Sequence, residues 1–145
     1  MTSAQDDDRR QIEALVGAHF DALRWKPGTR PDWDRFSADF HPEASLFAAA
    51  RPVRRQTLEA FIQRMNGVAE KLHSFEERTT GMQVLHFGNV AVALAASEML
   101  ENESEVNRDV SAYLLLKDGG AWRIAAHAWD KATAERPVPK ALRGS

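Results

Sequence analysis

The sequence predicts an α+β domain in which three helices are followed by a four-stranded antiparallel meander. Apolar residues recur with the 3.6-residue helical period up to about residue 66, and they alternate with a period of two from about residue 75. The length of 145 residues suits one domain. Because each predicted element has one apolar face, we expect the helices to cover one side of a curved sheet.

The first helix is predicted over residues 6–24, since apolar side chains from Ile12 to Leu23 form one stripe. A short second helix is expected to start at Asp32 as N-cap and to stop before Pro42. Residues 44–48 form a short predicted strand. The third helix is expected over residues 54–66, with Gly67 as its left-handed cap.

Four strands are predicted over residues 75–87, 90–101, 107–117 and 122–130. Gly88 and Asn89 indicate a tight hairpin turn between the first two. A polar segment joins the second to the third, and a loop over residues 118–120 joins the third to the fourth.

The composition excludes several classes of protein. There is no cysteine, so disulfides and thiolate metal sites are excluded. The net charge of -2 leaves no electrostatic footprint for nucleic acid or an anionic membrane. No apolar run is long enough to span a membrane, and residues 1–8 do not read as a secretion signal, so we expect a cytoplasmic protein. The histidines show no metal-binding spacing, and we expect neither a metal nor a cofactor.

Four segments of the chain resemble the nuclear transport factor 2-like superfamily, which includes SnoaL-like and ketosteroid-isomerase-like proteins. They are residues 12–23, 40–47, 87–93 and 122–130. The resemblance implies a cystatin-like cone, in which a strongly curved, mainly antiparallel sheet and three helices enclose an internal pocket. The predicted domain covers residues 1–132, and residues 133–145 form a predicted mobile tail.

The superfamily contains isomerases, polyketide cyclases, dehydratases and noncatalytic binding or assembly domains, so the fold alone does not decide the function. The usual ketosteroid isomerases use a carboxylate just after the first strand and a tyrosine from the first helix. Here residues 48–52 contain no carboxylate, and the only tyrosine, Tyr113, lies on a predicted strand. The sequence therefore argues against that reaction.

The candidate catalytic residues depend on the loop that joins the last two strands. If this loop has three residues, one sheet face is apolar from Leu116 and Trp122 as far as Val110, and it ends in Arg108 beside Asp130. We take this as the helix-facing side, and the neighbouring hairpin adds Glu98 to the same end. Asp130 or Glu98 is then the expected proton-transfer group and Arg108 the substrate-orienting group. The alternative is a structural ion pair.

The remaining pocket candidates are mainly aromatic. Phe20, Trp33, Phe36 and Phe61 are expected to form an apolar wall. With the three-residue loop, Tyr113, His127 and Trp129 lie on the outer face, where small residues at 91, 93, 95 and 97 would let a second copy approach. With a loop of two or four residues the faces exchange, and His127 and Trp129 line the pocket. A nucleophile triad of Asp109, Ser111 and His127 is disfavoured, because no nucleophile elbow is evident.

Two functions follow from these expectations. The first is a SnoaL-like pocket protein that acts as a cofactor-free lyase, isomerase or cyclase on a small, apolar carbonyl compound. The alternative is a noncatalytic ligand-binding or homodimeric assembly module in which the charged residues are structural. In both cases we expect a homodimer and no nucleic-acid or membrane partner.

Overall fold

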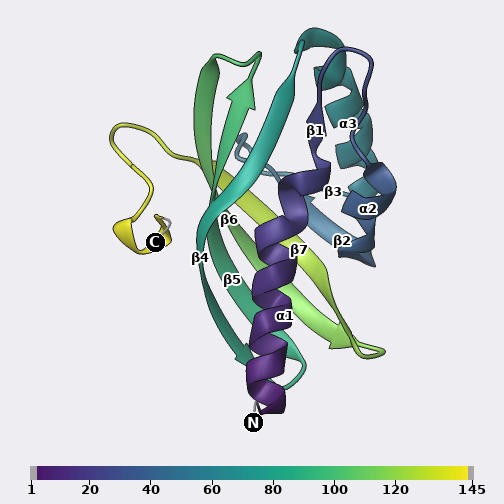
Figure 1. Ribbon diagram of the computed structural model, residues 1–145, viewed down its shortest axis with the longest axis vertical. Helices are drawn as coiled ribbons and strands as arrows, with labels where there is room; N and C mark the ends of the chain where they lie inside the picture. The colour runs from purple at the N-terminus through teal and green to yellow at the C-terminus, as the bar shows by residue number, and fades with distance from the viewer. Residues whose placement is uncertain (1–2, 144–145) are drawn as a thin grey trace.

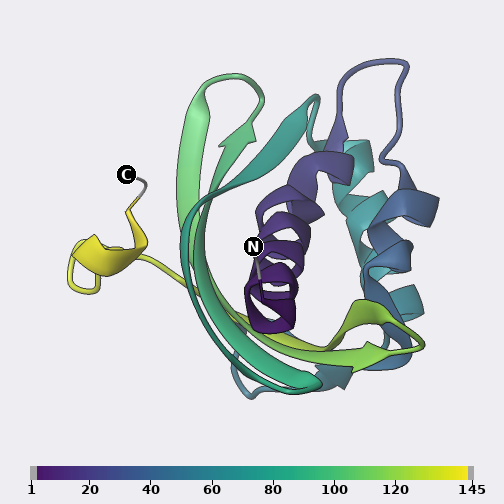
Figure 2. The same cartoon turned by 60° about the horizontal axis from the view of Figure 1, so that its bottom comes forward.

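A strongly curled seven-stranded sheet wraps around the first helix in the computed structural model (Figure 1), which describes residues 3–143. Figure 2 shows all three α-helices on the concave side of the sheet and the C-terminal segment on the outer side. Residues 1–2 and 144–145, the ends of the predicted domain and tail, lie outside the described residues. No helix between residues 3 and 143 combines the length and apolarity needed to cross a membrane.

The first helix is shorter than predicted. α1 (Ala4–Ala18) follows its N-cap residue Ser3, whose Oγ accepts a hydrogen bond from the backbone N–H of Asp6. A 3₁₀ turn, η1 (His19–Ala22), and the two-residue strand β1 (Arg24–Trp25) follow in place of the last helical turn. This departure directs the rings of His19 and Phe20 into the core, where both are buried.

The other two helices begin at side-chain caps. α2 (Trp33–Ala38) starts after Asp32, as predicted, and α3 (Leu58–Lys71) starts after Thr57. The predicted end of α3 at Gly67 is wrong, because the helix continues through this residue to Lys71. Val68 and Leu72 extend its apolar face over the core, and this packing outweighs the low helix propensity of one glycine.

The strands form one sheet with the order β1-β4-β5-β6-β7-β2-β3. The meander consists of β4 (Phe75–Phe87), β5 (Val90–Glu101), β6 (Glu105–Asp118) and β7 (Ala121–Lys131), close to the predicted bounds. β2 (Phe40–Phe47) pairs in parallel with β7, and β3 (Arg55–Gln56) pairs with β2.

The three-residue loop expected between β6 and β7 is wrong, and the two-residue alternative is confirmed, so the faces of β6 are exchanged. Only Gly119 and Gly120 separate the strands, both at positive φ, and Asp118 pairs with Ala121. Such a turn matches the right-handed twist of a hairpin. A second irregularity lies opposite Leu114 and Leu115, so the far half of β7 also changes face.

The face expected to meet the helices is therefore the outer face over most of the meander. Leu85, Val92, Leu94 and Leu114 are all exposed on it. The small residues expected to meet a second copy are buried inside instead: Ala91, Ala93, Ala95 and Ser97. Their size lets α1 approach the concave side, where it contacts β4 and β5.

The C-terminal segment, predicted to be mobile, lies against the outer side of the sheet as far as it is described. Its short 3₁₀ turn, η2 (Lys140–Leu142), contacts β4 and β5, and the side chain of Leu142 is buried. The backbone carbonyl of Leu142 meets β4 at Gly81, where an added Cβ atom would clash with the carbonyl oxygen. Docking of this segment therefore requires glycine at position 81.

We predict that Gly81→Ala lowers the free energy of unfolding by about 1–3 kcal/mol, because the added methyl group forces the backbone of Leu142 away. Chemical denaturation measures the loss, and limited proteolysis should cut the C-terminal segment sooner. Gly67→Ala is the matched control. A Cβ atom there meets nothing within 4 Å, and alanine suits the interior of α3 better than glycine, so this variant should not lose stability. Equal stability of the two variants would contradict the docking.

Candidate functional site

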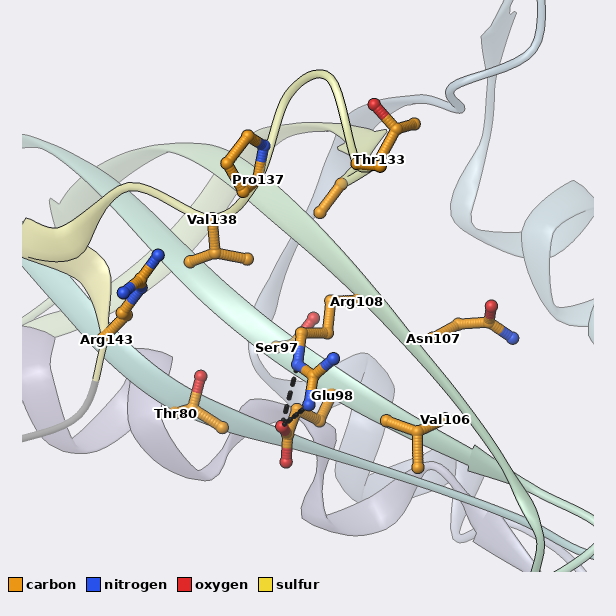
Figure 3. A pocket seen from close by; sticks show the side chains of 12 residues that line it. Thr80, Ser97, Glu98, Val106, Asn107, Arg108, Thr133, Pro137, Val138 and Arg143 are labelled. Carbon is orange, nitrogen blue, oxygen red and sulfur yellow. Dashed lines mark hydrogen bonds and ion pairs between the residues drawn. The ribbon is translucent and has the colours of Figure 1, made fainter.

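Two of the three predicted catalytic residues meet on the outer face rather than inside the cone. Glu98 accepts hydrogen bonds from Arg78 at 2.8 Å and from Arg108 at 3.0 Å. Glu98 and Arg108 line a groove of about 630 Å³ between the sheet and the C-terminal segment (Figure 3). Asp130 lies apart from them and pairs with Arg136 at 3.3 Å. The three residues therefore do not converge at the mouth of the cone as expected. Glu98 and Arg108 meet on the outer face, and Asp130 pairs with a different arginine.

The environment of Glu98 suits an ion pair better than a proton-transfer group. The hydrogen bond from Arg78 is the main cause that lowers the pKa of this carboxyl; burial opposes the shift, and Arg108 adds to the lowering. Glu98 is thus ionised at neutral pH and its oxygens are already occupied. A general base needs a pKa nearer to the working pH.

The interior of the cone holds a cavity of about 250 Å³ between η1, α3 and the four strands of the meander. Its walls are mostly apolar and aromatic, with side chains such as Phe20, Phe61, Met65, Val68, Met99 and Trp129. The polar side chains that the sheet contributes are Glu77, Glu101, Asp109, Ser111, His127 and Lys131. An apolar cavity with a few convergent polar groups is the usual form of a small-molecule site.

Of the predicted pocket residues, Phe20, Phe61, His127 and Trp129 line this cavity. The other three lie beside it. Phe36 is buried between His19 and Phe61, and the indole N–H of Trp33 donates to Asn66 Oδ1. The ring of Tyr113 stacks on His127 with centroids 4.4 Å apart.

Two buried carboxyl groups distinguish the cavity. Burial raises the pKa of Glu77 to about 8; the hydrogen bond from Ser97 Oγ, at 2.9 Å, opposes this shift, and the nearby Asp109 adds to it. Burial also raises the pKa of Asp109 to about 6, partly offset by Lys131. Oδ1 of Asp109 has no hydrogen-bond partner among the described residues. At neutral pH Glu77 is therefore largely protonated, and Asp109 is poised to exchange a proton.

His127 supplies a neutral imidazole next to these carboxyl groups. Its Nε2 is hydrogen-bonded to Ser111 Oγ at 2.9 Å, and burial, with a smaller contribution from His19, lowers its pKa well below the ordinary range. Nδ1 has no partner in the described part of the chain. A serine triad needs an acid bonded to this second nitrogen, so the arrangement is not a nucleophile triad. Nδ1 of His127 is thus left without a hydrogen bond beside the cavity.

Behind this group, a second histidine is held by an acid. His19 Nδ1 lies 2.7 Å from Asp39 Oδ2, and the His19 ring stacks on Phe36. Its centroid is 6.3 Å from that of His127. Through these contacts η1 and α2 support the wall of the cavity.

Arg64 of α3 lies at the mouth of the cavity. Its guanidinium carbon is 5.4 Å from the centroid of the Phe61 ring and 5.8 Å from that of Trp129. Arg64 and Lys131 are exposed members of the lining, so they mark the opening to solvent. Within residues 3–143 no group of three or more histidine or acidic side chains is arranged to hold a metal ion.

The sequence did not reveal Glu77, and the three-residue loop expected between β6 and β7 placed their polar residues on the outer face, whereas the two-residue alternative placed His127 and Trp129 in the pocket, as observed. Glu77 stands between two exposed residues, Glu76 and Arg78, and this charged run reads as a solvated edge. The signal that could have found it is its spacing of two from Phe75, which is buried in the core. The inward position of His127 and Asp109 depends on the length of the turn between β6 and β7, which the sequence left open.

The domain signature covers most of this fold: a family model described as "SnoaL-like domain" matches residues 12–129. The chain belongs to the SnoaL-like domain family. No curated protein sequence matches this SnoaL-like chain significantly.

Solved structures confirm the cone of the SnoaL-like protein. A protein of unknown function with a cystatin-like fold from Nostoc punctiforme is 12% identical, with a TM-score of 0.70 over 91% of this chain and 95% of the other. A proposed dehydratase of the NTF2-like family from Streptomyces avermitilis is 14% identical, with a TM-score of 0.70 over 90% and 100%. A ketosteroid isomerase-like protein from Erwinia carotovora atroseptica is 18% identical, with a TM-score of 0.66 over 88% and 98%. At these identities the likeness shows the fold alone.

We predict that Glu77→Gln flattens the pH dependence of stability. A carboxyl with a raised pKa binds its proton more tightly in the folded state, so the free energy of unfolding falls as pH rises from the ordinary value of 4.5 to about 8. The loss attributable to Glu77 is on the order of a few kcal/mol. Urea denaturation between pH 5 and 8.5 measures it.

Glu76→Gln makes the same chemical change at the adjacent exposed position and should keep the wild-type slope. A slope that is the same in Glu77→Gln and in the wild type would show that Glu77 is not a protonated buried acid.

Proposed function

We propose that this SnoaL-like protein binds a small, mostly apolar carbonyl compound in the interior cavity and catalyses its isomerisation, dehydration or cyclisation by cofactor-free proton transfer. The supporting observation is the pair of buried carboxyl groups, Glu77 and Asp109, whose pKa values are raised to about 8 and about 6 in an apolar cavity. Carboxyl groups with separated pKa values can share the roles of acid and base at one pH.

The two carboxyl groups have different proposed roles. Asp109, with an unpartnered oxygen and a pKa near neutrality, is the base that takes a proton from the carbon beside the carbonyl. The electron pair of that C–H bond forms a carbon–carbon double bond to the carbonyl carbon, and the π pair of the carbonyl group moves onto its oxygen. The protonated Glu77 or an N–H of His127 donates to the oxygen as its charge grows. The same groups then return the proton to another carbon of the compound, which gives an isomer, or to a departing hydroxyl group, which leaves as water.

The size of the cavity limits the ligand. Its volume is about 250 Å³. Ligand sites for drug-sized molecules are commonly about 300–1,000 Å³. The proposed substrate is therefore a compound of one ring or a short chain.

We predict that the wild type accelerates exchange of the α-protons of cyclohexanone in D₂O and that Asp109→Asn lowers this rate by about 10²–10⁴-fold. Proton NMR measures the exchange. Asp34→Asn is the matched control, because it makes the same chemical change at an exposed position of α2, outside the cavity lining. Equal loss in both variants would contradict the role of Asp109. Binding of cyclohexanone without any acceleration by the wild type would favour the noncatalytic ligand-binding module.

The alternative function, homodimeric assembly, is favoured by the apolar outer face of the meander. Phe87 is 84% exposed and Leu85 is 73% exposed, with Val92, Leu94 and Leu114 nearby on the same face. Exposed apolar patches of this kind on one side of a sheet commonly mark contact surfaces. We propose that a second copy covers this patch around a two-fold axis, which would use the same residues in both chains.

We predict that Leu94→Glu converts a dimer into a monomer, because two buried carboxylates would face each other across the axis. Light scattering after size-exclusion chromatography measures the mass. Gln63→Glu adds the same charge at an exposed position of α3, away from the sheet, and should leave the mass unchanged. A wild-type monomer at high concentration would remove the assembly proposal and leave the cavity chemistry untouched.

A further inference from the structure

The mouth of the interior cavity carries an arginine that no acid neutralises. Arg64 makes no ion pair among residues 3–143, although seven other arginine and lysine side chains do. Burial alone lowers its pKa, and no charged neighbour contributes to the shift. The guanidinium is therefore charged, partly desolvated and available for a ligand.

Two aromatic rings hold this guanidinium in place. Phe61 lies 5.4 Å from it and Trp129 lies 5.8 Å from it, and the two rings meet edge to face. Cation–π contacts of this kind restrict a side chain that otherwise has many rotamers. An arginine that is already ordered loses less conformational entropy when it binds, and its planar fork matches a carboxylate.

Charged, aromatic and apolar side chains share the lining of this cavity. Trp129 stands between Arg64 and His127, since its ring contacts both. Lys131, a second cation of the mouth, lies directly across from Asp109 on the neighbouring strand. The remaining acids of the lining are Glu77, which is largely uncharged at neutral pH, and Glu101 of β5. An anion at the mouth thus meets two cations beside the mostly apolar wall of α3.

We infer that the ligand of this cavity carries a carboxylate, which Arg64 binds at the mouth while an apolar body fills the interior. This inference rests on the proposed function, because it assigns the ligand class of the same cavity. Arg64 is a specificity-determining residue: it selects an anion over a neutral compound of the same shape. One guanidinium with Lys131 nearby suits a single negative charge.

The test compares phenylacetate with phenylacetamide, which has nearly the same shape but no charge. Titration calorimetry with the full chain, supported by chemical-shift changes of cavity residues, measures both affinities. We expect the wild type to bind phenylacetate about two- to fivefold more tightly, as one partly exposed ion pair would give. The preference should shrink as salt is raised.

Arg64→Met keeps the apolar stem and should bind both compounds equally, at about the wild-type affinity for the amide. Lys71→Met is the matched control: it removes one positive charge from the exposed last turn of the same helix, away from the cavity, and should keep the preference. Arg64→Lys retains the positive charge without the planar guanidinium group and should keep part of the preference for phenylacetate. Melting temperatures of the variants establish that each is folded.

Three results would overturn the inference. Equal affinity of the wild type for both compounds, with cavity residues shifted, removes the anion selectivity and leaves the proposed function standing. A preference that survives Arg64→Met, or that Lys71→Met also loses, shows that overall charge rather than Arg64 selects the ligand. Binding of neither compound in the cavity contradicts the inference and the proposed ligand site together.

Discussion

A turn of two glycines decides which side of the sheet faces the interior of this protein. Gly119 and Gly120 both adopt positive φ, which places Asp118 opposite Ala121 and directs Asp109, Ser111 and Tyr113 of β6 towards the helices. Side chains alternate along a strand, so a loop longer by one residue would send this whole set to the outside. The cavity, its acid–base groups and the apolar outer face all depend on this register.

The interior is polar at a cost to stability that the fold only partly offsets. Ser97 satisfies Glu77, and Ser111 satisfies one nitrogen of His127, but Asp109 Oδ1 and His127 Nδ1 keep no partner within the described chain. Buried groups without partners typically cost about 1–3 kcal/mol each. Such groups cluster around a cavity large enough for a ligand, which could complete their hydrogen bonds. The same burial shifts the pKa values that proton transfer needs.

The outer face shows the opposite distribution. Its apolar side chains lie in solvent at one end of the meander, while Glu98 joins Arg78 and Arg108 at the other end beside the C-terminal segment. Leu142 anchors that segment over β4. One end of the face is thus covered by the protein's own chain, and the apolar side chains of the other end are exposed.

The sequence by itself determined the order of the three α-helices and the four strands of the meander, and it located the N-cap at Asp32. It also located a turn within residues 118–120 and the bounds of β4 and β5. These features rest on local periodicity and turn chemistry. The short strands β1 and β3 were not predicted. Four of the predicted wall residues, Phe20, Phe61, His127 and Trp129, also line the cavity. Only the tertiary structure decided the face of each strand, the inward position of Glu77 and the separation of Asp130 from Glu98. The reason is that a period of two divides residues into two sets without saying which set is buried, and a turn length or bulge changes that choice by a single residue.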